Sequence, residues 1–93
     1  TRGSSKLRII FKDKSFLDVW LTATGKYSYH WEQRAQRGVL YRHDNAPDHP
    51  EVHTYPKHLH DGSDQNVKPS NLSNDPQTAF VYLLDIARKS LSK

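Results

Sequence analysis

The sequence predicts an α+β fold in which an antiparallel meander sheet of about four to six strands carries a C-terminal amphipathic helix packed on one face. Two observations lead to this fold class. Apolar and polar residues alternate with period two through much of the first half of the chain, as in strands with one buried face. Near the C-terminus the apolar residues recur at helical spacing instead, and a helix that follows a run of strands packs on their sheet. At 93 residues, the chain is expected to form one domain over residues 1–93.

Four segments have the composition and alternation of strands. After a loose tail at residues 1–5, they are residues 6–12, 16–23, 26–33 and 39–44. In the third segment Tyr27, Tyr29 and Trp31 alternate with polar residues, which predicts that these rings share one sheet face and fill the core. Residues 34–38 are polar and end in glycine, which is typical of a hairpin loop.

The fourth strand is followed by a turn and then by a weaker strand pattern. Asp44 and Asn45 favour a turn through side-chain hydrogen bonds to the backbone, and Pro47 cannot donate to a strand ladder, so these three residues are interpreted as a structural turn. The alternative is that this segment orients a histidine. A fifth, interrupted strand is expected over residues 53–60, and a short edge segment over residues 65–68.

Residues 75–91 are predicted to form the helix. Asn74 or Asp75 can cap its N-terminus, and Pro76 suits the first helical position. The apolar stripe consists of Phe80, Leu83, Leu84, Ala87 and Leu91. Because one helix covers one face of a sheet, the other face is expected to remain free for binding.

Composition narrows the classes of function. Lys and Arg total 14 against 10 for Asp and Glu, for a net charge of +4, which is a mild bias toward RNA, DNA or an acidic partner. The absence of cysteine excludes disulfides and thiolate metal sites and fits a cytoplasmic protein. No membrane association is expected, because no apolar run approaches the ~20 residues of a membrane span. The sequence lacks a Gly-rich phosphate loop, which argues against nucleoside triphosphate chemistry.

Residues 42–60 hold five of the six histidines. On a strand, His58 and His60 would project from the same face. Such a pair can act as general base and general acid in RNA cleavage, and His49 is the third catalytic candidate. The same spacing can supply two zinc ligands, with His53 or His49 as the third and water as the fourth. A third interpretation is that both histidines are polar residues facing solvent.

Cations and an aromatic residue accompany the histidines. Arg42 and Lys57 are candidates to stabilise negative charge on a phosphate. Tyr55 is a candidate to stack on a base, and His53 to contact the substrate. The expected mechanism needs no cofactor, and zinc or another divalent metal on the histidines is the alternative.

Three stretches of the chain share spaced polar and aromatic residues with a known family. They are KYSYHW at residues 26–31, R-x-D-N-A-P-x-H-P-E at residues 42–51 and T-x-P-x-H-x-H at residues 54–60. The chain resembles, over roughly residues 26–69, the TumE family of small prokaryotic toxins from toxin–antitoxin pairs. Lys57 and Leu59 stand where the family pattern has a histidine and a basic residue, and His43 stands where an aromatic residue is common.

The resemblance implies a small α+β toxin whose toxicity is ascribed to RNA cleavage. It also implies neutralisation by an antitoxin with a helix-turn-helix domain, and a homodimer is compatible with it. Three functions therefore stay open: a metal-independent endoribonuclease toxin, which is the expectation, a non-catalytic nucleic-acid or partner-binding module, and a metal-dependent nuclease.

Overall fold

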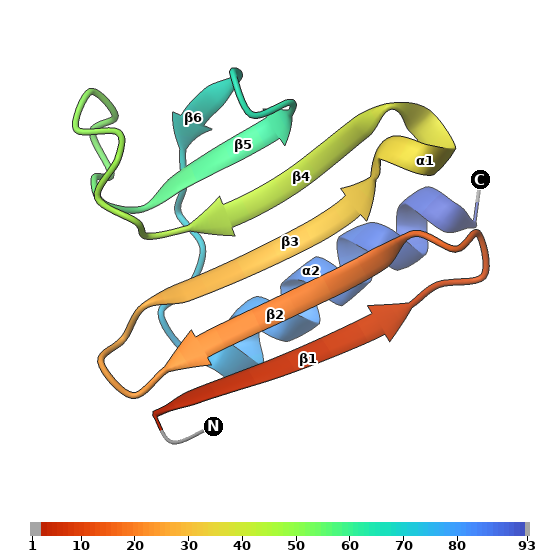
Figure 1. The fold of residues 1–93 in the computed structure, drawn as a ribbon, viewed down its shortest axis with the longest axis horizontal. Helices are drawn as coiled ribbons and strands as arrows, with labels where there is room; N and C mark the ends of the chain where they lie inside the picture. Colours follow the sequence, from red (N-terminus) through yellow and green to blue (C-terminus); the bar gives the residue numbers. More distant parts are fainter. Residues whose placement is uncertain (1–2, 93) are drawn as a thin grey trace.

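The computed structural model, which describes residues 3–92, contains a six-stranded antiparallel sheet and a C-terminal helix packed against one of its faces (Figure 1). Neighbouring strands in the sheet are also consecutive in the chain, so the sheet is a meander, and the predicted fold class is confirmed. The elements are β1 (Ser4–Ile10), β2 (Phe16–Thr22), β3 (Tyr27–Gln33), α1 (Arg34–Arg37), β4 (Val39–Asp44), β5 (His58–Gly62), β6 (Val67–Pro69) and α2 (Pro76–Leu91).

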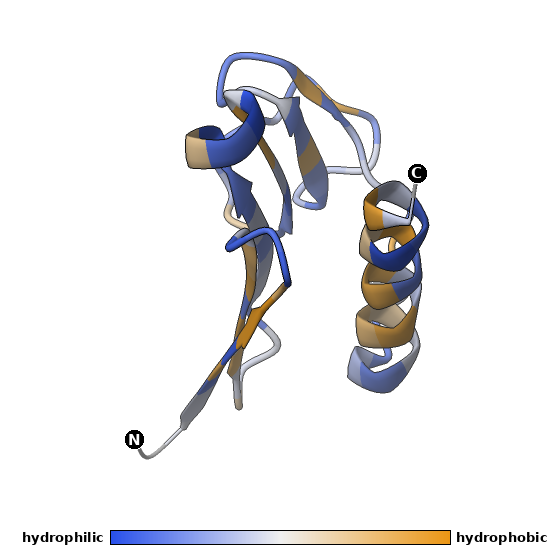
Figure 2. Ribbon diagram, turned by 90° about the vertical axis from the view of Figure 1, so that its right-hand side faces the viewer, coloured by the Kyte–Doolittle hydropathy of each residue, from blue (hydrophilic) through white to orange (hydrophobic). Residues whose placement is uncertain are grey.

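The hydrophobic core lies between α2 and the sheet face that the helix covers, which we call the helix face. Tyr27, Tyr29 and Trp31 are buried on this face, as the period-two pattern predicts. The buried core residues are Leu17, Val19, Tyr27, Tyr29, Trp31, Leu72, Ala79, Leu83 and Ala87. Figure 2 shows the apolar side of α2 turned toward the sheet.

The helix begins where its capping residue predicts. Asp75 is the N-cap, and its carboxylate accepts a hydrogen bond from the backbone N–H of Thr78 at 3.0 Å. Pro76 occupies the first helical position, where its missing N–H has no partner to lose. The stripe that faces the core is centred on Ala79, Leu83 and Ala87, whereas Leu84 is only partly buried.

Two sequence predictions about local structure are wrong at their boundaries, and one predicted loop contains a helical turn. Ser4 already pairs with Thr22, so the loose tail does not reach residue 5; residues 1 and 2 lie outside the described range. Residues 34–38 connect the antiparallel strands β3 and β4, as the predicted hairpin loop requires. Within this loop residues 34–37 form the one-turn helix α1, because Gly38 adopts the left-handed conformation with φ 71° and its N–H closes the turn on the Arg34 carbonyl. The short edge segment is β6, which lies slightly further along the chain than expected.

The fifth strand begins at His58 and not at residue 53. Consecutive turns precede it, in which the N–H groups of Val52, Tyr55 and Lys57 donate to carbonyls three residues earlier. Pro50 and Pro56 have no N–H to offer to a ladder. Residues 45–57, which we call the His-rich loop, therefore leave the sheet after β4 and return to it at β5.

No helix in residues 3–92 is long and apolar enough to cross a membrane.

Candidate functional site

Strand register gathers the polar residues on the sheet face opposite α2, which we call the open face. Arg42 on β4 pairs with His30 on β3 and with His60 on β5. Asp44, two residues further along β4, pairs with His58. Directly paired residues of antiparallel strands point to the same side of the sheet, so all five side chains share the open face.

The two histidines of β5 are close together and buried. Their Nε2 atoms lie 3.1 Å apart, and the residues are only 1% (His58) and 5% (His60) exposed. The expectation that the two imidazoles project to one face is confirmed by the register. The alternative in which both face solvent is wrong.

Backbone carbonyls define which ring nitrogens carry protons. The Nδ1 atom of His58 lies 3.0 Å from the Pro56 carbonyl oxygen, and that of His60 lies 3.0 Å from the Asp64 carbonyl oxygen. A carbonyl oxygen only accepts hydrogen bonds, so both Nδ1 atoms must donate. The two Nε2 atoms then face each other with lone pairs, and their 3.1 Å contact needs a shared proton or a cation between them.

Asp44 contacts the imidazole pair in addition to the turn backbone. Its carboxylate accepts from the Ala46 N–H, which is the turn contact expected of it. The same carboxylate also lies 3.1 Å from Nε2 of His58 and 3.8 Å from Nε2 of His60, and it is itself buried. Its negative charge therefore stabilises a proton or a cation held at the imidazole pair. The signal that could have found it is its place two residues after Arg42 on a strand neighbouring the histidines.

His49 brings a third imidazole from the His-rich loop. Its ring centre lies 4.8 Å from that of His58 and 5.5 Å from that of His60. Its Nδ1 atom is 3.0 Å from a carboxylate oxygen of Glu51. One ring nitrogen from each of His49, His58 and His60 lies within 4.8 Å of the others, which is close enough for one metal ion. We call these three residues the histidine cluster.

Burial sets the protonation tendency of His60. Loss of solvent is the largest effect and lowers the pKa of His60 below its ordinary value, although the hydrogen bond to the Asp64 carbonyl acts in the opposite direction. A neutral His60 is the form that can accept a proton or donate its Nε2 lone pair to a cation.

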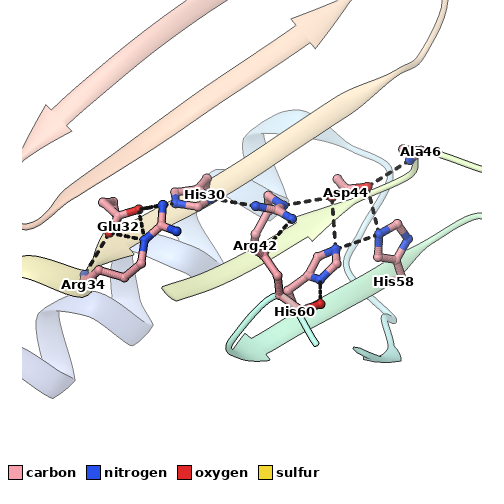
Figure 3. Close-up of polar contacts among 9 residues, drawn as sticks. His30, Glu32, Arg34, Arg42, Asp44, Ala46, His58 and His60 are labelled. Carbon is pink, nitrogen blue, oxygen red and sulfur yellow. Dashed lines mark hydrogen bonds and ion pairs between the residues drawn. The ribbon is translucent and has the colours of Figure 1, made fainter. Parts of the chain in front are cut away.

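Arg42 links the histidine cluster to a polar network that runs across the open face (Figure 3). Its guanidinium donates to Asp44 at 3.1 Å and to Asp64 at 2.9 Å, and it lies 3.3 Å from Nδ1 of His30. Because arginine only donates, His30 accepts at Nδ1 and donates from Nε2 to Glu32 at 2.9 Å. Arg42 is thus anchored beside the cluster with part of its surface still exposed.

The pKa of Glu32, at the far end of this network, falls to about 2. The hydrogen bond from the Arg34 side chain is the main cause, followed by burial, which opposes it, and by the bond from His30. Glu32 is therefore ionised at neutral pH and holds one end of the network in place.

Other candidates lie apart from the histidine cluster. The ammonium group of Lys57 donates to the Leu72 carbonyl, and Leu72 belongs to the core under α2. His53 and Tyr55 are exposed on the His-rich loop, and Tyr55 is 47% exposed. His53 does not belong to the histidine cluster.

The remaining turn residues have positions that suit a structural role. The Asn45 side chain accepts from the Tyr27 N–H at 2.9 Å and donates to the Gly25 carbonyl at 2.9 Å, so it joins the start of the loop to the β2–β3 turn. Pro47, two residues after Asn45, is exposed.

A family model described as toxin TumE matches residues 1–91 of the chain. The chain belongs to this family. Comparison with curated proteins and with solved structures found no match. The match confirms the resemblance and extends it well beyond residues 26–69. Membership supports a toxin role for this TumE-family protein and implies a cognate antitoxin as its partner.

Proposed function

We propose that this TumE-family toxin is an endoribonuclease and that the histidine cluster with Asp44 is its catalytic centre. The observation that carries the proposal is the contact of His58 and His60, whose Nε2 atoms meet at 3.1 Å beside a buried carboxylate. A buried set of proton-accepting groups is costly to a fold unless hydrogen bonds satisfy it. Buried imidazoles gathered beside a carboxylate in this way are typical of functional sites.

The proposed reaction uses the RNA 2′-hydroxyl as the nucleophile. The 2′-oxygen forms a bond to phosphorus as its proton passes to a base, and the bond from phosphorus to the 5′-oxygen breaks as that oxygen takes a proton from an acid. The products are a 2′,3′-cyclic phosphate and a free 5′-hydroxyl. Arg42, which borders the cluster, would stabilise charge on the non-bridging oxygens.

The metal-independent form of this reaction, which the sequence favours, assigns base and acid to His58 and His60. The attacking and leaving oxygens lie on opposite sides of phosphorus, so a base and an acid must flank it. Two Nε2 atoms in mutual contact at 3.1 Å act from one side. In this conformation a metal-independent route therefore needs His49 as the second partner across the phosphate.

A metal-dependent route is the second candidate, and one observation favours it. All three imidazoles of the histidine cluster have Nδ1 next to an acceptor, which leaves each Nε2 free for a common cation. The pair of β5 histidines would then act as ligands without separating.

Substrate contacts are proposed for the cations and aromatic group of the same region. Arg42 would contact phosphate, and Tyr55 and His53, which are exposed on the His-rich loop, would contact bases or the neighbouring backbone. Lys57 could join them only after releasing the Leu72 carbonyl. Such a toxin would act on cytoplasmic RNA, and its antitoxin would carry a helix-turn-helix domain.

Cleavage of an end-labelled RNA tests the proposal. The wild-type toxin should produce 2′,3′-cyclic phosphate ends, and a single 2′-deoxy substitution at the cut site should abolish cleavage there. His60→Ala should lower the rate by roughly 10²–10⁴. His43→Gln is the matched control, because His43 lies on the helix face and outside the cluster.

Two results would overturn the proposal. One is RNA binding without any cleavage, which would instead support the non-catalytic binding module. The other is cleavage that His60→Ala and His58→Ala leave unchanged. Co-expression with the neighbouring reading frame should relieve growth arrest if that frame encodes the antitoxin.

A further inference from the structure

We infer that His49, His58 and His60 form a binding site for one divalent transition metal ion of the zinc class. The metal site itself does not depend on RNA cleavage, whereas its use in catalysis rests on the proposed function. Three features of the histidine cluster carry the inference: the protonation of its rings, the spacing of its nitrogens and the chemistry of its donors.

The ring protonation is that of metal-ligating histidines. Each Nδ1 has an acceptor at 3.0 Å: the Glu51 carboxylate for His49, the Pro56 carbonyl for His58 and the Asp64 carbonyl for His60. A histidine that binds a metal through one nitrogen almost always donates its other ring N–H to a carboxylate or a carbonyl. All three rings of the cluster meet this condition at once.

The nitrogen spacing also fits one ion. Two nitrogens bound at about 2.0–2.1 Å to a tetrahedral ion lie about 3.3 Å apart. The Nε2 atoms of His58 and His60 are 3.1 Å apart, and one ring nitrogen of His49 lies within 4.8 Å of a ring nitrogen of each. A small movement of the His-rich loop would bring His49 into coordination distance.

The donor set selects the class of metal. Three imidazoles suit zinc, cobalt, nickel and copper, whereas magnesium and calcium require mainly oxygen ligands. Asp44, 3.1 Å from Nε2 of His58, adds a negative charge that offsets the charge of the ion. Three protein ligands leave a fourth position for water or a phosphate oxygen, which is the arrangement of catalytic zinc sites.

The location gives the ion a structural consequence as well. His58 and His60 belong to β5, and His49 comes from the His-rich loop. An ion bound by all three would fix the loop against the sheet. His49 is the ligand on the solvent side, with 27% of its side chain exposed, so the open position would face outward.

Titration of the chelator-treated full-length toxin with Zn²⁺ or Co²⁺ tests the site. Calorimetry should give one Zn²⁺ per chain, and Co²⁺ should give the visible absorption of a four-coordinate site with three nitrogen ligands. A roughly tenfold excess of Mg²⁺ should not displace Zn²⁺, because Mg²⁺ prefers oxygen ligands to imidazole nitrogens. Far-UV circular dichroism of each variant checks that the fold is retained.

Variants identify the ligands. His49→Ala and His60→Ala should each weaken Zn²⁺ binding by about 100-fold or more, and Glu51→Gln, which changes the acceptor of His49, by about 10–100-fold. His53→Ala is the matched control on the same loop, and its affinity should stay within about twofold of the wild type, because His53 is outside the cluster. If His60→Ala does not fold, Glu51→Gln on the exposed loop still tests whether His49 is a ligand.

Absence of saturable Zn²⁺ binding would overturn the inference, and so would equal losses in His49→Ala and His53→Ala. The outcomes also separate the site from the proposed function. Zinc binding without RNA cleavage overturns the proposed function alone. Cleavage by a toxin that binds no zinc overturns the metal site alone.

Discussion

The two faces of the sheet are both buried in part, but different forces hold them. On the helix face, Leu17, Tyr29 and Leu83 pack through apolar contact. On the open face, Asp44, His58 and His60 are nearly as inaccessible, yet they meet through hydrogen bonds and ion pairs. Apolar contact is non-directional and tolerates small shifts. The polar cluster works only in one strand register, since a slip by one residue would move every side chain to the other face.

The largest expected effect is the loss of the buried carboxylate on the open face. Asp44→Ala should lower the free energy of unfolding by about 3–5 kcal/mol, because it leaves the buried imidazole pair without its counter-charge and removes one of the two carboxylates that Arg42 contacts. Urea unfolding monitored by tryptophan fluorescence measures the change.

Asp18→Ala is the matched control for this substitution. Asp18 pairs with Arg8 on the same face, but its side chain is 40% exposed. Its loss should cost only about 0.2–1 kcal/mol. Equal effects at Asp44 and Asp18 would show that burial does not distinguish the two ion pairs.

On the helix face, Leu83→Ala should cost about 2–5 kcal/mol, because Leu83 is fully enclosed between α2 and the sheet. Leu84→Ala should cost clearly less, since Leu84 is only partly buried. The same urea titration compares the two adjacent leucines. A larger effect at Leu84 would contradict the orientation of α2 in the structure.

Sequence patterns could predict the helix face almost completely. Alternation predicts Tyr27, Tyr29 and Trp31 as core residues, and the buried stripe on α2 lies only part of a turn from the predicted one, nearer to Leu83 and Ala79 than to Leu84. These features are local, because each follows from the period of one strand or one helix.

The open face was predictable only in part, for a physical reason. That His58 and His60 share a face follows from their spacing. The contact of Asp44 with both depends on which residue of β4 pairs with which residue of β5. The position of His49 depends on how successive turns return the His-rich loop to the sheet. Period-two patterns carry neither kind of information.

His43 extends the comparison to the pH dependence of stability, because it is a buried histidine on the helix face. It contacts Ser70 at 2.7 Å and Tyr41 at 3.1 Å. Burial is the main cause that lowers the pKa of His43 from 6.5 to about 4. Between these two values the unfolded chain binds a proton that the folded protein does not, so stability falls as the pH falls.

The expected loss is about 3 kcal/mol between pH 6.5 and pH 4, with no further contribution from His43 below that window. Unfolding at a series of pH values, in wild type and in His43→Gln, isolates this contribution from that of His60, whose pKa is also lowered. Parallel stability curves for the two proteins would contradict the assignment.

The smallest expected effect concerns the start of α2, where the sequence is compatible with either of two capping residues. The structure assigns the cap to Asp75, whose carboxylate accepts from both the N–H and the hydroxyl of Thr78. Asp75→Ala should therefore cost about 1 kcal/mol. Asn74→Ala should cost almost nothing, because Asn74 is exposed and is not the N-cap. Thermal unfolding of the two variants side by side decides which residue caps the helix. A larger loss of stability in Asn74→Ala would contradict the assignment of the cap to Asp75 and would place the helix start one residue earlier.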